Sequence, residues 1–217
     1  MIVDLNLQNK TIVVVGGGNE AQKRINSLLK QECKIIVISN KVTPNIIKLS
    51  KTKKIILKKQ KISDTKFILK LKPDLIITTT DDKEINQKII NDAKKKNILA
   101  YSSDNPDDSD FSNPAVIDFE NMIQIAIFTG GKSPIMSKKI KDRSEKLFKK
   151  IITKEDIAQI KIQKTARKIA KETIPTPEQR RECLRSIMSD NEIDQLIKDG
   201  QIKKAEKRAV TILRNWK

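Results

Sequence analysis

Residues 11–21 read TIVVVGGGNEA, a block of β-branched residues that ends in three glycines and is followed by Asn-Glu-Ala. Apolar residues from Ala21 to Leu29 then recur at helical spacing. The stretch therefore predicts a strand over 11–15, a tight glycine turn and a helix over 19–32. A strand that runs through glycines directly into a helix is the context in which a nucleotide-binding turn occurs.

The glycine turn fits the pattern G-x-G-x-x-A, with Gly16, Gly18 and Ala21 at the three defined positions. The first glycine allows the tight turn, the second lets the backbone approach a pyrophosphate, and the alanine permits close packing of helix on strand. Free N–H groups at the helix N-terminus favour an anion. A purely structural glycine turn is the alternative. The predicted cofactor-binding residues here are Gly16, Gly17, Gly18, Asn19 and Ala21.

Strand and helix signals alternate along the next eighty or so residues. Five such repeats predict a parallel sheet with helices on both faces. The further strands are expected at 34–38, 54–57, 74–79 and 98–102, and the further helices at 44–49, 64–71 and 82–97.

Two polar segments follow strands of this sheet and are candidates for the nucleotide site. Ser39 and Asn40 stand where a ribose-binding carboxylate is usual, and either can hydrogen-bond a ribose hydroxyl, whereas Lys41 favours a 2′-phosphate. The choice between NAD and NADP therefore stays open on this chemistry. The fourth strand ends at the carboxyl edge of the sheet in Thr79, Thr80 and Asp81. These residues are predicted to bind the cofactor; the alternative is that their hydroxyls only end the strand and cap the next helix.

After Asp104 the alternation stops in a polar, turn-forming stretch. Two strands joined at Glu120-Asn121 and a helix that begins with Ser133-Pro134 follow, and the rest reads as helix. We expect domains at 1–112, 113–150 and 151–217. The elements expected here are strands at 114–119 and 122–129 and helices at 133–152, 154–172, 176–188 (capping box Thr176 to Gln179), 189–200 (opened by Ser189 with Glu192) and 202–216.

Composition limits the class of protein. The 217 residues include 45 Lys and Arg, 27 Asp and Glu and no histidine, so the formal charge is +18 and imidazole is not available as a metal ligand or base. Aromatic residues make up only 3 %, which leaves few platforms for stacking nucleic-acid bases. No apolar run approaches the roughly 18 residues of a spanning helix. We expect a cytoplasmic protein with no nucleic-acid or membrane partner.

Several short motifs together resemble one family, the precorrin-2 dehydrogenases of the siroheme-synthase N-terminal type, some of which also chelate iron. The resemblance runs from about residue 5 to 150, and its most specific parts are the last two. The matching residues are Val14 to Gly18 with Ala21 and Arg24, Thr79 to Asp82 with Asn86, Asp104, Asp110-Phe111 with Asn113-Pro114-Ala115, and Thr129 to Pro134.

The resemblance implies a Rossmann-like NAD-binding domain, a small α+β dimerisation domain that interlocks with a second copy, and an all-helical C-terminal domain, with the active site between domains. NAD⁺ would accept a hydride from precorrin-2, and the macrocycle would lose protons to become sirohydrochlorin. By position Asp104 is the catalytic carboxylate, as general base or as the group that positions the macrocycle. The bland alternative is an Asx turn into Asn105-Pro106.

The resemblance places the polycarboxylate substrate near Arg24, Asn113, Lys132 and Ser133. Ser133 reads first as a helix N-cap, and Arg24 and Lys132 are also compatible with solvated charges. The net charge of +18 would steer such a polyanion to the protein. We expect no resident metal, and we leave ferrochelatase activity open. The rival hypothesis is a nucleotide-sensing regulatory domain that uses the same glycine turn without a redox step.

Overall fold

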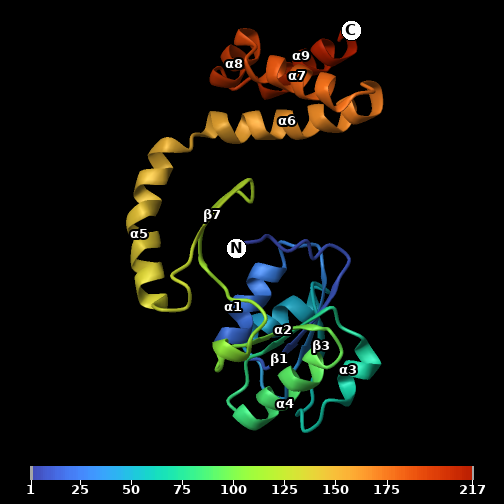
Figure 1. Ribbon diagram of the computed structural model, residues 1–217, viewed down its shortest axis with the longest axis vertical. Coiled ribbons are helices and arrows are strands. Elements are labelled where there is room, and N and C mark those ends of the chain that lie inside the picture. Colours follow the sequence, from blue (N-terminus) through green and yellow to red (C-terminus); the bar gives the residue numbers. More distant parts are fainter. Residues whose placement is uncertain (1, 217) are drawn as a thin grey trace. The chain divides into compact units, whose positions relative to one another are not determined.

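The computed structural model describes residues 2–216 (Figure 1). The chain forms two compact units, which divide after Asn113. The finer division into three domains at 112 and 150 stays a prediction.

The first unit is built on a five-stranded parallel sheet of order β3-β2-β1-β4-β5. The chain begins in the middle of the sheet, moves outward to β3 and then crosses to β4 on the other side of β1. The crevice at this reversal, outside the carboxyl ends of β1 and β4, is where open α/β sheets bind their ligands. The strands are β1 (Thr11–Val15), β2 (Lys34–Ile38), β3 (Ile56–Lys58), β4 (Leu75–Thr78) and β5 (Leu99–Ser102).

Helices cover both faces of the sheet, as the alternation predicted. Because successive side chains of a strand point to opposite faces, Ile12 and Val14 of β1 join one apolar cluster and Val13 and Val15 join the other. The first cluster includes residues of α1 (Asn19–Leu28) and α2 (Pro44–Lys51), and the second includes residues of α3 (Lys66–Leu71) and α4 (Lys83–Lys94).

Some predicted boundaries are wrong by a few residues. The helix predicted over 19–32 ends at Leu28, because the chain turns back toward β2 through Glu32, whose φ is 51°. The helix predicted over 82–97 ends at Lys94, because the chain turns toward β5 through Asn97, whose φ is 56°. The strand predicted over 54–57 is β3, Ile56–Lys58.

The second unit begins with the predicted hairpin. Strands β6 (Ala115–Phe119) and β7 (Ile123–Ile127) pair antiparallel. Glu120 and Asn121 in the turn both have positive φ, of 53° and 56°, as tight hairpin turns require. Before the hairpin, the polar stretch of the first unit contains one short 3₁₀ turn, Pro106–Asp108.

Five helices follow, and the last four enclose a core of their own. That core is largely Ile and Ala, and it includes Cys183, which is fully buried. Burial raises the pKa of the Cys183 thiol above its ordinary value. The helices are α5 (Pro134–Ile151), α6 (Lys154–Thr173), α7 (Pro177–Met188), α8 (Asn191–Lys198) and α9 (Ile202–Arg214).

Two predicted helix starts are wrong in detail. At α7, the Thr176 hydroxyl accepts from the N–H of Gln179, but the Gln179 side chain contacts that hydroxyl rather than the backbone, so the capping box is incomplete. A complete box opens α6, between Thr153 and Asp156. Ser189 ends α7 instead of opening the next helix, which Asp190 caps because its carboxylate reaches the N–H of Ile193.

Candidate functional site

The glycine turn lies at the carboxyl ends of β1 and β4. Gly16 has a φ of 116°, and a Cβ there would lie 2.2 Å from Thr79 Oγ1. A Cβ on Gly17 would lie 2.3 Å from the carbonyl oxygen of Lys41. These two glycines are therefore required by the protein's own packing, since the loop after β4 and the loop after β2 both approach the turn closely.

Gly18 differs from its two neighbours. A Cβ at this position would meet no atom within 4 Å, so the fold itself does not demand glycine here. Gly18 is also the N-cap of α1, and it provides no side-chain hydrogen bond to the first turn. The result is an open space in front of uncapped backbone N–H groups, which fits the diphosphate of a dinucleotide.

A cleft of about 580 Å³ opens from this turn. Nine of the ten predicted cofactor residues line it, and the tenth, Ala21, is fully buried against the sheet, where it allows α1 to pack closely. The nine are Gly16, Gly17, Gly18, Asn19, Ser39, Asn40, Thr79, Thr80 and Asp81.

At the β2 end of the cleft the hydrogen-bonding groups are not equivalent. Ser39 Oγ donates to the carbonyl of Lys41 at 2.6 Å, so its proton is already used within the loop. Asn40 and Lys41 are exposed and line the cleft. Among the described residues no carboxylate replaces the usual ribose ligand at this end. The structure adds Gln60 and Lys61, from the loop after β3, which were not predicted because that loop carries no recognisable motif.

Glu20 also lines the cleft, where a negative charge would oppose a diphosphate. Burial opposes its ionisation, but hydrogen bonds and positive charge from Lys23 and Arg24 leave the pKa of Glu20 below its ordinary value. The carboxylate is neutralised by ion pairs with these two side chains.

Asp104 follows β5 and belongs to a connected set of polar groups. Its Oδ1 accepts hydrogen bonds from Ser102 Oγ at 2.6 Å and from the Asn86 amide at 3.0 Å. Asn86 in turn accepts from the Thr80 hydroxyl at 2.6 Å and donates to the Thr80 carbonyl at 2.8 Å. Thr80 lines the glycine cleft, so this chain of bonds joins Asp104 to it.

Asp104 itself does not line the glycine cleft. It borders a neighbouring depression together with Asn105 and residues of α4. From the sequence, Asn86 was identified only as part of the resemblance, and Ser102 was not predicted to belong to the site. Both are polar and almost completely buried, at 1 % and 2 % exposure, a property that single-sequence patterns do not show.

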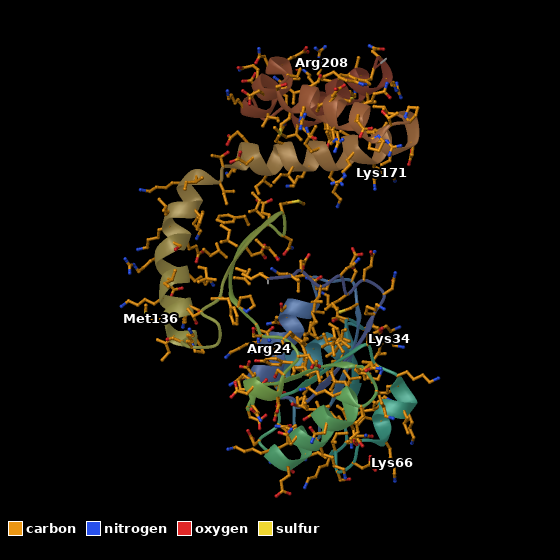
Figure 2. The ribbon with its side chains drawn as sticks, viewed as in Figure 1. Arg24, Lys34, Lys66, Met136, Lys171 and Arg208 are labelled. Atoms are coloured by element: carbon orange, nitrogen blue, oxygen red, sulfur yellow. The ribbon has the colours of Figure 1, made fainter. Side chains whose placement is uncertain are left out.

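The residues predicted to contact substrate are placed as follows. In the first unit, Arg24, which is labelled in Figure 2, donates to the Tyr101 hydroxyl at 3.1 Å and lies 5.0 Å from the centre of its ring. Arg24 also pairs with Glu20, so its charge is partly used. Asn113 is exposed. In the second unit, Lys132 is exposed, and Ser133 caps α5 by accepting from the N–H of Met136, as its first interpretation predicted.

Two other kinds of feature are absent from residues 2–216. No group of three or more His, Cys, Asp or Glu side chains in this range is placed to hold a metal ion. No helix within it is both long enough and apolar enough to cross a membrane.

Relatives of the chain carry one recurrent name. The chain is 29 % identical over 201 residues to a siroheme synthase of Psychromonas ingrahamii, and the match covers 92 % of this chain and 40 % of that protein. It is 32 % identical over 143 residues to a siroheme synthase of Ruthia magnifica, covering 65 % of this chain and 29 % of the relative. The chain thus spans less than half the length of these relatives.

A solved structure and a family complete the comparison. The structure titled "SirC, precorrin-2 dehydrogenase" has the same fold, with a TM-score of 0.68 at 22 % identity, over 96 % of this chain and 99 % of that one. Residues 3–115 match the family described as "Putative NAD(P)-binding", and this range contains the whole glycine cleft. Since the match takes in more than half of the sequence, the chain belongs to this NAD(P)-binding family.

Proposed function

We propose that the chain is an NAD-dependent precorrin-2 dehydrogenase that forms sirohydrochlorin. The observation that carries the proposal is the hydrogen-bonded chain from Thr80, in the glycine cleft, through Asn86 to Asp104 at the end of β5. It links a nucleotide site to a single oriented carboxylate. The names of the siroheme synthase relatives and of the solved dehydrogenase support the choice of substrate.

The reaction removes a hydride and a proton from the macrocycle. When bound, NAD⁺ supplies the hydride acceptor. The chain's own part is to hold the diphosphate at Gly18 and the N-terminus of α1, and to receive the proton on Asp104. Hydrogen bonds from Ser102 and Asn86 fix one oxygen of that carboxylate, and no described residue donates to its Oδ2, which is the proton acceptor in this proposal.

The carboxylates at the edge of the proposed substrate would be bound by cationic and polar side chains of the protein. Arg24, Asn113, Lys132 and Ser133 are the groups we assign to substrate recognition. The net charge of +18, with +8 on residues 1–111 and +10 on residues 112–217, favours encounter with a polyanion.

We also propose a homodimer formed through α5. Of its 18 residues only Ser137 is buried. Met136, Ile140, Leu147 and Ile151 fall on one stripe of the helix, and their exposures of 42 %, 37 %, 58 % and 60 % are high for large apolar side chains. A second copy presents the same stripe, so two chains can cover it in a self-complementary contact.

Three further points belong to this proposal. The helix α5 and the hairpin before it act as a dimerisation region over 113–150, distinct from the helical residues 151–217. The protein works in the cytoplasm. Chelation of iron by the same protein is an additional hypothesis. Because the chain has no histidine, carboxylates would have to accept the pyrrole protons in that reaction.

The test is to supply enzymatically made precorrin-2 with NAD⁺ or NADP⁺ and to follow sirohydrochlorin absorbance and reduced cofactor together. We expect both signals to rise with NAD⁺ in equal amounts. Binding of NAD⁺ without turnover on either cofactor would contradict the proposal and favour the nucleotide-sensing regulatory domain. Adding ferrous ion and sirohydrochlorin in a separate assay tests for chelatase activity.

A further inference from the structure

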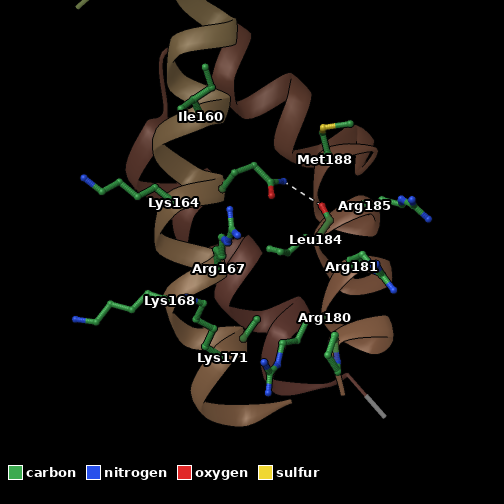
Figure 3. Close-up of a pocket in the computed structure, with 13 residues that line it drawn as sticks. Ile160, Lys164, Arg167, Lys168, Lys171, Arg180, Arg181, Leu184, Arg185 and Met188 are labelled. Atoms are coloured by element: carbon green, nitrogen blue, oxygen red, sulfur yellow. Dashed lines mark hydrogen bonds between the residues drawn. The ribbon is translucent and has the colours of Figure 1, made fainter. Parts of the chain in front are cut away.

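A groove of about 960 Å³ runs between α6 and α7 in the second unit (Figure 3). Seven Lys and Arg side chains line it, and no Asp or Glu does. The groove shares no residue with the glycine cleft, so its charge is not explained by the nucleotide.

Five of the seven cations are available to a ligand. Lys164, Arg167, Lys168, Lys171 and Arg185 are exposed, and no carboxylate among the described residues lies within 4.0 Å of their charged groups. The other two have structural partners. Arg180 donates to the carbonyls of Ile174 and Pro175 at 2.6 and 2.8 Å, and Arg181 pairs with Glu178 at 2.8 Å.

The cations flank a surface that is apolar. Ile160, Ala170, Pro177, Leu184 and Met188 supply this surface, and Met188 is 62 % exposed at one end of the groove. The Gln163 amide donates to the Leu184 carbonyl at 3.1 Å and so ties the two helices together across the groove. In Figure 3, Lys164 and Lys168 extend outward from α6, Arg181 and Arg185 extend from α7 on the opposite side, and Arg167 lies between the helices.

An apolar surface between two rows of cations is complementary to a flat apolar molecule that carries carboxylates around its edge. Guanidinium and ammonium groups would pair with the carboxylates, and the ring would cover Leu184 and Met188. Single-stranded nucleic acid is a poorer match, because its bases stack on aromatic side chains and none lines the groove.

We propose that the α6–α7 groove is a binding site for a polycarboxylate tetrapyrrole, distinct from the nucleotide cleft. The ligand class rests on the proposed function, whose substrate and product are both molecules of this kind. The site gives the helical unit a role: it holds substrate before oxidation or product after it.

The experiment titrates the whole 217-residue chain with uroporphyrin, a stable porphyrin with carboxylates around the ring, and follows porphyrin fluorescence. The groove variant is Lys164→Gln/Arg167→Gln, at exposed positions in the middle of α6. The matched control is Lys204→Gln/Lys207→Gln on α9, with the same spacing and the same loss of charge outside the groove. We expect the groove variant to bind one porphyrin per chain about tenfold more weakly, and the control to bind as the unmodified protein does.

Unchanged binding by the groove variant overturns the inference, and so does an equal loss in both variants, which would indicate nonspecific attraction. If oligothymidylate displaces the porphyrin from the groove at a concentration lower than that of the porphyrin, the inference is overturned in favour of a nucleic-acid site. The dehydrogenase assay, run on the same preparations, separates the two proposals. Turnover without a groove effect contradicts only the groove, whereas a groove effect without turnover contradicts only the proposed function.

Discussion

Ser102 Oγ donates a 2.6 Å hydrogen bond to Oδ1 of Asp104, two residues further along the chain. The same Ser102 oxygen lies 3.0 Å from Thr78 Oγ1 on the neighbouring strand, and both hydroxyls are buried. The exposed carboxylate of Asp104 is thus oriented by buried hydroxyls at the ends of two paired strands. Pre-organisation of this kind fixes the direction in which the free oxygen can accept a proton.

Asp104→Asn tests the carboxylate itself. The amide keeps the size of the side chain but removes the base, so we expect kcat for precorrin-2 oxidation to fall by about 100-fold or more while the Kd for NAD⁺ stays the same. Steady-state kinetics and calorimetric titration with NAD⁺ measure the two quantities. Asp107→Asn, exposed in the 3₁₀ turn and with the same change of charge, serves as the control. Normal turnover by Asp104→Asn would refute its catalytic role.

Ser102→Ala tests orientation. Asn86 still donates to Asp104, so we expect kcat to fall by about tenfold, less than in Asp104→Asn, with KM for NAD⁺ unchanged. Ser103→Ala is the control, because the buried hydroxyl of Ser103 has no hydrogen-bond partner among the described residues. If the two alanine variants have the same kcat, Ser102 has no positioning role.

The glycines separate packing from binding. Gly16→Ala places a Cβ against Thr79 at a φ of 116°, and we expect the free energy of unfolding to fall by about 1–2 kcal/mol or more. Gly18→Ala meets no protein atom, so its stability should change by less than about 1 kcal/mol while NAD⁺ binds about tenfold more weakly. Urea denaturation and NAD⁺ titration are the measurements. Full NAD⁺ affinity in Gly18→Ala would show that the diphosphate lies elsewhere.

The sheet and its cleft were predictable because their signals are local. Strand, glycine turn and helix follow one another within residues 11–28, and parallel strands bring their carboxyl ends to one edge whatever the details. For this reason the cleft gathers Gly16 and Thr79, which are far apart in the chain.

Other features depend on contacts that a single sequence does not reveal. Lys61 reaches the cleft from a loop without a motif, and the role of Ser102 depends on its hydrogen bonds to Asp104 and to Thr78 on the neighbouring strand. The start of α8 was misplaced by one residue because Ser189 and Asp190 are both good caps, and the geometry at the end of α7 selects Asp190. The α6–α7 groove was not predicted, since its cations come from two helices and read individually as solvated charges.

Asn40→Asp tests the choice of cofactor. A carboxylate at the end of β2 would accept hydrogen bonds from a ribose and repel a 2′-phosphate, so we expect the ratio of NAD⁺ to NADP⁺ affinity to rise about tenfold. Asn97→Asp adds the same charge in the turn before β5, outside the cleft, and should leave the ratio unchanged. An unchanged ratio in Asn40→Asp would place the ribose away from this residue.

Asp74 makes stability depend on pH. Its carboxylate accepts from the Thr11 N–H at 2.8 Å and from Lys10 at 3.0 Å, and these bonds hold the pKa of Asp74 below its ordinary value of 3.8. A lowered pKa in the folded state stabilises the protein fully above that ordinary value, and the effect is lost as the pH falls below it.

Asp74→Ala should therefore lower the free energy of unfolding by about 1 kcal/mol at pH 7, a figure reduced for solvent screening because the side chain is 40 % exposed. The difference from the unmodified protein should shrink as the pH falls below 3.8. Urea denaturation across this range measures it. A difference that is constant with pH would mean that ionisation of Asp74 does not contribute.

Leu147→Lys tests the proposed dimer. Leu147 is 58 % exposed on the apolar stripe of α5, so a charge there costs little in the single chain but would be buried without a partner between two copies. We expect dissociation to monomers, observed by sedimentation velocity, with little change in helical content by circular dichroism. Asp142→Asn changes the charge by the same amount on another face of α5 and should remain dimeric. Ile140 lies on the same apolar stripe, so Ile140→Lys would also bury an unpaired charge between the two copies and should give the same dissociation. A dimer that survives both lysine substitutions must be formed by some other surface.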